Sequence, residues 1–332
     1  MRRGKIILFL WALVSMLSLG RMAENQAYDG PGSLASGTSV VIPSGSTKVV
    51  AVRLKAAGVI RHPWMFEAAA WLTRGKFPLR SGEFWFPAKA SLHQVLDVLR
   101  FAPEVEHKIT VPGGLTSIQI AAIINNTPDA TGSVAPPPEG SILPQTYAYL
   151  RDTTRQTILN RMEKAMRRAL AKAWAHRAPG LPLQTPEQAL VLASIVQQET
   201  PLPAELPRIA SVYENRLIRK MKLQADPTVI YAVTHGAQTS LRHPVDAQNL
   251  STDSPYNTYL HRSLPPGPIC SPDLAAINAV LHPASTKDIY FVATGKGGHV
   301  FARNFKEQLA NIGRYQALRN QQRLHGAAAP AH

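Results

Sequence analysis

Cysteine and acidic residues are scarce in this chain of 332 residues. Cys270 is the only cysteine, so no disulfide can form within the chain. Asp and Glu number 21 against 36 Lys and Arg, which gives a formal net charge of +15 at pH 7. A charge of this sign indicates an anionic neighbour, such as a membrane surface, an acidic polymer or a nucleic acid. The sequence has neither an aromatic RNA-binding motif nor zinc-finger spacing, so we do not expect a nucleic-acid partner.

Metal-ligand and phosphate-loop motifs are also missing. The histidines of the C-terminal half lack a spacing such as H-E-x-x-H, so we predict no metal site. They are His235, His243, His261, His282 and His299. The glycine-rich segment 295–298 lacks Walker spacing and lies between two β-prone runs, so it predicts the turn of a hairpin.

Only one long apolar run is present, at the N-terminus. Arg2, Arg3 and Lys5 precede an apolar run over 6–20, and the charge rule then leaves the N-terminus in the cytoplasm and the remainder outside. A cleaved signal peptide is the competing interpretation, because the run is short. No clean small-x-small cleavage site follows it, and we therefore predict an uncleaved single-pass anchor over residues 1–21.

The N-terminal half has a weak internal repeat. Residues 22–37 are polar and rich in Gly and Ser, which predicts a flexible tether. Short β-prone runs at 39–42 and 108–111 are each followed by a Gly-containing turn and a helical pattern. Between them we predict a strand over 82–86 and a capped helix over 91–99.

A Pro-, Gly- and Ser-rich segment at 127–138 marks a boundary or an exposed loop. Beyond it, apolar periodicity and capping residues predict a series of helices. They cover about 153–174, 185–200, 205–220, 226–231 and 273–281. A hairpin is predicted over 288–302. Strands and helices are mixed without a regular βαβ alternation, so the fold class is α+β.

Glu199 is the candidate catalytic residue. The predicted helix 185–200 starts at Thr185 as N-cap and ends before Pro201. Glu199 continues the apolar stripe of Leu192, Ile195 and Val196, which predicts that its carboxyl group lies in the core or in a cleft. Burial and the negative end of the helix dipole would both raise its pKa, as a general acid requires. The competing interpretation is a solvated Glu in the last turn of an amphipathic helix.

Several motifs resemble those of one enzyme family in residues, order and spacing. They are 192–200, 210–217, 223–231, 256–259, 264–269, 290–299 and Glu139–Pro144. Through them the chain, over roughly 38–320, is similar to the YceG-like endolytic murein transglycosylases (MltG). The resemblance implies a membrane anchor (1–21), a tether (22–37), a LysM-like region (38–135), a mixed α+β catalytic domain (139–323) and a disordered tail (324–332).

The same resemblance implies an activity and a location. Such an enzyme cleaves the MurNAc-β-1,4-GlcNAc bond within nascent glycan strands, leaves a 1,6-anhydroMurNAc end, terminates glycan elongation and needs no cofactor. Its partners would be peptidoglycan glycan strands, the inner membrane and peptidoglycan synthases, with the catalytic domain in the periplasm. Glu199 matches the second Glu of the family's E-K-E-T-like segment. Gln197 replaces the first Glu, and Gln145 replaces an acid often found after the Leu-Pro of the E-G…L-P motif, so neither is assigned a catalytic role.

The resemblance also places polar and aromatic residues around the cleft. Such side chains stack on sugar rings and bind hydroxyl groups. The candidate substrate-binding residues are Asn215, Gln224, Asp226, Tyr256, Asn257 and Tyr259. For some of them a structural role competes: Asn215 could brace a loop, Tyr256 could belong to the core, and Asp226 could be a helix N-cap.

Two other functions compete with a lytic transglycosylase. One is a non-catalytic LysM-type scaffold that binds peptidoglycan, and the other is a muramidase that hydrolyses the same bond with water. A lytic enzyme uses the MurNAc C6 hydroxyl in place of water and needs one carboxylate, whereas hydrolytic glycosidases normally use two. The sequence leaves open whether a distant second acid, Asp226 or Glu214, takes part in the reaction.

Overall fold

The computed structural model describes residues 28–75, 77–241 and 243–327, and the chain forms two compact units. Unit 1 ends at His107 and also includes Tyr149–Asp152, while unit 2 comprises Lys108–Ala148 and the chain from Thr153 onward. The predicted anchor (1–21) and the first residues of the tether lie outside the described residues. Within the described ranges, every helix is too short or too polar to cross a bilayer.

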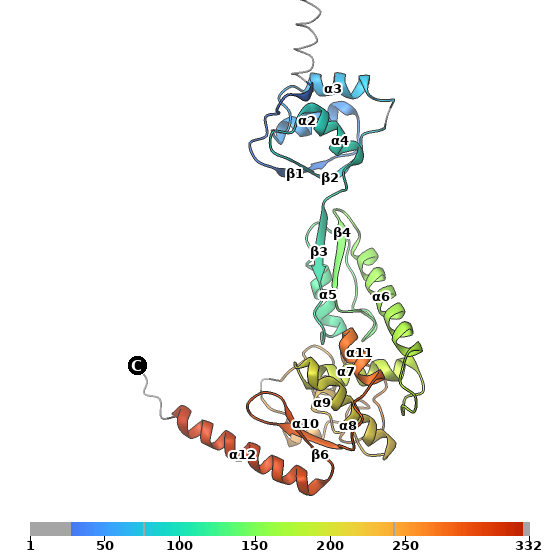
Figure 1. The fold of residues 1–332 in the computed structure, drawn as a ribbon, viewed down its shortest axis with the longest axis vertical. Helices are drawn as coiled ribbons and strands as arrows, with labels where there is room; N and C mark the ends of the chain where they lie inside the picture. The colour runs from blue at the N-terminus through green and yellow to red at the C-terminus, as the bar shows by residue number, and fades with distance from the viewer. Residues whose placement is uncertain (1–27, 76, 242, 328–332) are drawn as a thin grey trace, which may run out of the picture. The chain divides into compact units, whose positions relative to one another are not determined.

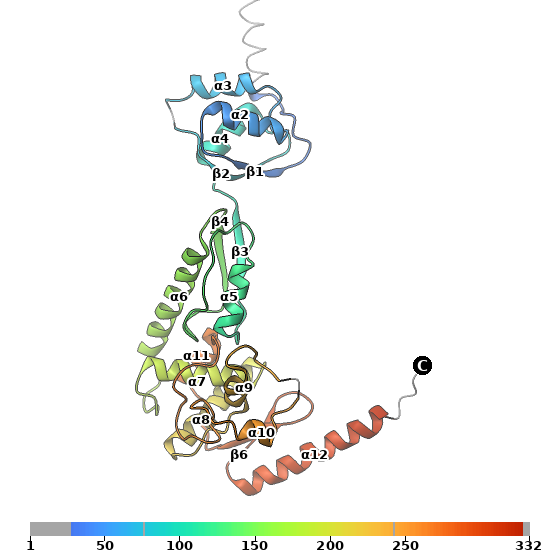
Figure 2. The ribbon, with the colours of Figure 1, turned by 180° about the vertical axis from the view of Figure 1, so that it is seen from behind.

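Unit 1 is a small sheet covered on one side by helices (Figure 1 and Figure 2). Its elements are β1 (Thr38–Ile42), α2 (Thr47–Ala56), α3 (Pro63–Leu72), β2 (Gly82–Phe86) and α4 (Leu92–Phe101). β1 and β2 pair antiparallel, with Val40 opposite Phe84. Because side chains alternate along a strand, these two residues face the helices and are buried with Leu54 and Leu96. Ser91 and Gln94 form the predicted capping box of α4.

Unit 2 contains most of the helices. Its elements are β3 (Glu106–Thr110), α5 (Ser117–Asn125), β4 (Thr146–Leu150), α6 (Arg155–Ala175), α7 (Pro186–Glu199), η1 (Pro203–Glu205), α8 (Leu206–Ile218), α9 (Asp226–Thr234), α10 (Ala247–Leu250), α11 (Leu274–Leu281), β5 (Tyr290–Ala293), β6 (His299–Ala302) and α12 (Phe305–Ala327). β3 pairs with β4, and the residues of these strands at 106–107 and 149–150 are counted in unit 1. β5 and β6 form an antiparallel hairpin, against which α12 packs.

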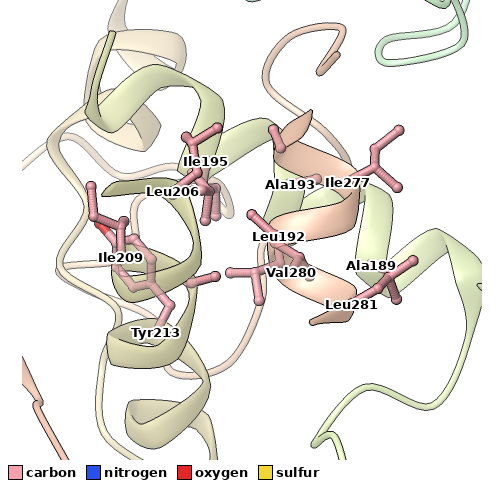
Figure 3. Packing of buried hydrophobic residues seen from close by; sticks show 14 of the residues in the cluster. Ala189, Leu192, Ala193, Ile195, Leu206, Ile209, Tyr213, Ile277, Val280 and Leu281 are labelled. Atoms are coloured by element: carbon pink, nitrogen blue, oxygen red, sulfur yellow. The ribbon is translucent and has the colours of Figure 1, made fainter. Parts of the chain in front are cut away.

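Helix α7 is the central element of the core of unit 2 (Figure 3). Its Ala189, Leu192 and Ala193 face the apolar side chains of α11, and Ile195 lies beside Leu206 at the start of α8. From Val191 to Val196 every residue is buried, so the middle of the helix is enclosed on all sides rather than on one face. A carboxyl group at the end of this helix therefore has a rigid support.

The mixed α+β class, the helices beyond residue 150 and the hairpin are confirmed. The repeat occurs as β1–α2 and β3–α5, but β1 pairs with β2 and β3 with β4, so the two copies do not pair with each other. The assignment of 38–135 as a LysM-like region stays a prediction. Helix α12 continues to Ala327, so the first residues of the predicted disordered tail (324–332) are helical.

Candidate active site

Helix α7 places Glu199 at its last position. Thr185 caps the helix by accepting a hydrogen bond from the Gln188 backbone N–H (3.2 Å), and Pro186 occupies the first turn, as predicted. The helix ends at Glu199 because Thr200, which precedes Pro201, is extended at φ −147° and ψ 139°. The Glu199 side chain is half-buried. It is therefore neither exposed to bulk solvent nor sealed in the core.

The carboxyl group of Glu199 is held by a tyrosine from the next helix. The Tyr213 hydroxyl, from α8, donates a hydrogen bond to Glu199 Oε1. The Tyr213 ring is buried and meets Phe291 of β5 edge to face, with 5.8 Å between ring centroids. Three elements, α7, α8 and β5, thus fix the position of one carboxyl oxygen.

Burial is the main cause that raises the pKa of Glu199, from 4.5 to about 7. The negative charge of Asp226 raises it further, while the Tyr213 hydrogen bond and the charge of Arg216 lower it. The pKa of Tyr213 is raised well above 10.0 by burial and by Glu199, so this hydroxyl stays a donor. Near neutral pH, Glu199 can therefore both give up and accept a proton.

Arg216 and Asp226 are the charged neighbours of this carboxyl group. Arg216 is buried, and its Nε donates to the carbonyl oxygen of Ile289 (2.7 Å), which joins α8 to the start of β5. Asp226 is exposed, and its Oδ1 accepts a hydrogen bond from the Tyr259 hydroxyl (2.5 Å). Asp226 is the first residue of α9 and does not cap the helix, which corrects the N-cap interpretation. Its carboxylate is used in the pair with Tyr259 instead.

Two predicted substrate-binding residues have structural hydrogen bonds. Asn257 is fully buried, and its Nδ2 donates to the carbonyl oxygens of Leu250 (3.0 Å) and Thr252 (2.9 Å). Asn215 Nδ2 donates to the carbonyl oxygens of Thr286 (3.0 Å) and Asp288 (2.9 Å). Both side chains therefore brace loops. For Asn215 this is the structural role that the sequence left open as the alternative to substrate binding.

Gln224 is exposed and lies in the left-handed region at φ 49°. Its backbone N–H donates to the Thr258 carbonyl oxygen (3.2 Å), so the loops that carry Asp226 and Tyr259 are joined next to the site. Below them the hydroxyl groups of Thr228 and Thr258 are buried and 2.8 Å apart. Both threonines lie within the motifs 223–231 and 256–259, but the sequence assigned neither of them a role.

Tyr256 belongs to a second cluster with Tyr231 and Glu139. The rings of Tyr256 and Tyr231 are tilted with centroids 4.8 Å apart, and the Tyr231 hydroxyl lies 3.4 Å from Glu139 Oε2. Glu139 Oε1 accepts a hydrogen bond from the Ser117 backbone N–H (2.8 Å). Burial raises the pKa of Glu139 although these hydrogen bonds lower it. Tyr256 also borders an open hollow of about 640 Å³ along the loop 252–256.

The open second-acid candidate Glu214 is buried, with 5% of its surface exposed. Burial raises its pKa to about 8, and its Oε1 has no hydrogen-bond partner among the residues that the structure describes. A protonated, enclosed carboxyl group of this kind is not placed to serve as a base at neutral pH.

Comparison with known proteins decides the family. A model of the YceG-like family matches residues 40–314. This chain belongs to the YceG-like family. A crystal structure of a YceG-like protein from Listeria monocytogenes is similar in fold, with a TM-score of 0.51 and 24% identity over 83% of this chain and 98% of that one.

Two relatives of this YceG-like chain are named endolytic murein transglycosylase. The one from Bacillus subtilis (strain 168) is 33% identical over 186 residues, which are 56% of this chain and 50% of the relative. The one from Streptococcus pneumoniae serotype 2 (strain D39 / NCTC 7466) is 34% identical over 171 residues, 51% of this chain and 30% of the relative. The match thus spans half or less of the length of these relatives.

The YceG-like chain also has a hydrogen-bonded Glu–His pair next to the site that the sequence did not predict. Glu205 accepts hydrogen bonds from the backbone N–H of His299 (2.7 Å), from His299 Nδ1 (2.8 Å) and from the hydroxyl of Thr200 (3.1 Å). These bonds join the residue after Glu199 to the β5–β6 hairpin. His299 ends one of the motifs of the sequence, 290–299, but the sequence alone did not show that it meets Glu205.

Proposed function

We propose that this chain is an endolytic murein transglycosylase whose general acid is Glu199. The observation that carries the proposal is a half-buried carboxyl group with a pKa of about 7, held by a tyrosine at the end of a rigid helix. Membership of the YceG-like family and the names of two relatives support the substrate class. A scaffold that only binds glycan has no use for such a group.

In the first half of the reaction, protonated Glu199 gives its proton to the glycosidic oxygen between MurNAc and GlcNAc. The bond from MurNAc C1 to that oxygen breaks, and positive charge develops at C1. GlcNAc leaves with a free hydroxyl group. The Tyr213 hydroxyl then stabilises the Glu199 carboxylate that remains.

In the second half, the C6 hydroxyl of the same MurNAc attacks C1, and its proton passes to the Glu199 carboxylate. The product is a 1,6-anhydroMurNAc end, and Glu199 is protonated again without water entering the reaction. The charge of Asp226 raises the pKa of Glu199 and so favours return of the proton. Asp226 and Tyr259 remain proposed substrate-binding residues, because both lie at the site and Asp226 is exposed. Gln224 and Tyr256 are proposed to contact sugar at its edges.

The test is digestion of purified, peptide-free glycan strands by the full chain, with products weighed by mass spectrometry. We expect anhydro ends from the wild type and no cleavage by Glu199→Gln. Glu187→Gln is the matched control, because Glu187 is an exposed acid at the other end of α7. Reducing ends with added water would instead assign a muramidase, and glycan binding without cleavage by the wild type would assign a scaffold.

We also propose the finer arrangement that the family resemblance implies. Residues 1–21 anchor the chain in the inner membrane with the N-terminus in the cytoplasm, and the catalytic part lies in the periplasm and ends glycan elongation beside peptidoglycan synthases. The β1–α2–α3–β2 order of unit 1 supports a LysM-like region. Accessibility of a cysteine introduced in unit 2 to a reagent that cannot cross the membrane, in intact cells, tests the orientation.

A further inference from the structure

Unit 1 contains a cavity of about 580 Å³ whose charged lining residues are all arginines. It lies between the turn after β1 and the segment that connects α3 to β2. Arg74, Arg80 and Arg100 line it. Within the described part of the chain, none of the three is ion-paired with a carboxylate, so the positive charge of this cavity is not neutralised. The lining contains no acidic residue, and Glu104 fills the space beside Gly82 without being part of the lining.

Arg100 is the clearest sign of an anion-binding site. It is only 8% exposed, and its Nη2 donates to the hydroxyl of Thr73 (2.8 Å). Its Nε is buried and has no hydrogen-bond partner among the described residues. A buried guanidinium group without a counter-ion carries a large desolvation cost, so an anion in the cavity would stabilise it.

The start of α2 adds to this positive potential. Ser44, Gly45 and Thr47 line the same cavity, and the N-cap Ser46 makes no side-chain cap hydrogen bond. The first intrahelical hydrogen bond is donated by Val49 to the Ser46 carbonyl oxygen, so the backbone N–H groups of Thr47 and Lys48 stay available to an anion beside the arginines. The cavity thus combines guanidinium groups with a helix N-terminus, the donors that suit a phosphate group.

Exposed aromatic side chains lie at and near the cavity. Phe77 lines it and meets Phe101 edge to face at 5.1 Å, and the Arg74 guanidinium lies 4.7 Å over the ring of Trp71. Trp71 is 60% exposed and Trp64, two turns earlier on the same face of α3, is 68% exposed. Tryptophans beside arginines are typical of surfaces that lie in the headgroup region of a bilayer.

We infer that this cavity binds the phosphate of an anionic phospholipid and that the exposed tryptophans of α3 enter the surface of the membrane. The inference rests on the proposed anchor, not on the proposed cleavage. The predicted anchor ends at residue 21 and the described chain begins at residue 28. Seven residues span at most about 25 Å, so unit 1 is confined near the bilayer. The net charge of +15 is of the sign that an anionic membrane attracts.

The test uses the full chain in lipid nanodiscs, with Trp11, Trp85 and Trp174 changed to Phe so that Trp64 and Trp71 report alone. Two kinds of disc are compared, and both contain brominated lipids, which quench tryptophan fluorescence. The anionic discs also contain phosphatidylglycerol, and the neutral discs contain phosphatidylcholine only. We expect strong quenching in the anionic discs and weak quenching in the neutral discs. Each of Arg74→Gln and Arg100→Gln should lower the docking equilibrium constant about fivefold, since each removes one cation near an anionic surface.

The matched control is Arg168→Gln, an exposed arginine of α6, which should leave quenching unchanged. A variant that keeps only Trp11 reports insertion of the anchor separately, and Glu199→Gln should not alter quenching. Circular dichroism checks that each variant folds. If Arg100→Gln does not fold, the test uses Arg74→Gln, because Arg74 is exposed. Equal quenching in both kinds of disc would overturn the inference. So would release of the tryptophans by soluble N-acetyl-D-alanyl-D-alanine, because the cavity would then bind a peptide carboxylate.

Discussion

Replacing Tyr213 by Phe isolates one hydrogen bond of the site. The change removes the hydroxyl that donates to Glu199 and keeps the ring that packs against Phe291. Because this hydrogen bond lowers the pKa of Glu199, its loss should raise that pKa. The acid would then stay protonated to higher pH.

The size of the shift follows from the strength of the bond. A hydrogen bond to a charged group contributes about 1.5–3 kcal/mol. At about 1.4 kcal/mol per unit, that is roughly one to two pH units. The pKa of Glu199 should therefore move from about 7 to roughly 8–9 in Tyr213→Phe. Cleavage requires the protonated acid, so the alkaline limb of the rate profile should move by the same amount.

The assay is the initial rate of glycan cleavage from pH 5 to pH 10, fitted to a plateau and a midpoint. Tyr213→Phe should lower the plateau, because Glu199 is less well oriented, while its midpoint moves to higher pH. Tyr256→Phe is the control for the midpoint alone: the Tyr256 ring packs on Tyr231, and the hydroxyl that bonds Glu199 is that of Tyr213, so the rate of this variant can change while its midpoint stays in place. A midpoint that stays in place or moves to lower pH would refute the role of Tyr213.

Three further changes test the site. In Glu199→Gln, the free energy of unfolding measured with denaturant should be higher than that of the wild type at pH 8 by about 1–3 kcal/mol, and should show no such gain at pH 4. The reason is that the pKa of Glu199 is about 7 in the folded chain against 4.5 for a free Glu, so the wild type loses stability as pH rises from 4.5 to 7. Glu205→Gln should speed amide exchange of the β5–β6 hairpin at neutral pH but not at acidic pH, since the lowered pKa of Glu205 gives stability that is lost as pH falls. Asn257→Ala should cost about 1–3 kcal/mol of stability and leave the Michaelis constant unchanged, because its partners are two backbone carbonyls. If a fully folded Asn257→Ala bound glycan more weakly than the wild type, Asn257 would contact substrate as first predicted.

Local patterns predicted much of the fold. Thr185, Ser91 and Asp273 cap helices as predicted, because a cap and its first turn depend on neighbours in sequence. Helices α3 and α12 and strand β4 were missed. The burial of α7 on all sides could not be predicted from its own periodicity, because the helices that pack against it, α8 and α11, come later in the sequence.

Glu199 could be singled out from the sequence, but its surroundings could not. Tyr213 is 14 residues further on, and the bond to Glu199 depends on how α8 packs against α7. The pairing of Asp226 with Tyr259 and of Glu205 with His299 joins residues 33 and 94 positions apart. Such contacts are set by tertiary packing, which no local pattern encodes. The predicted rise in the pKa of Glu199 agrees with the structure: burial, which was predicted, is its main cause, and the charge of Asp226, which was not predicted as a cause, adds to it.

The most direct test of the account is the origin of the oxygen atom at each new glycan end. The full chain digests peptide-free glycan in water enriched in ¹⁸O, and the products are weighed. We predict anhydro ends without ¹⁸O from the wild type and no new ends from Glu199→Gln. Incorporation of one ¹⁸O per cleavage, or normal turnover by Glu199→Gln, would contradict the account.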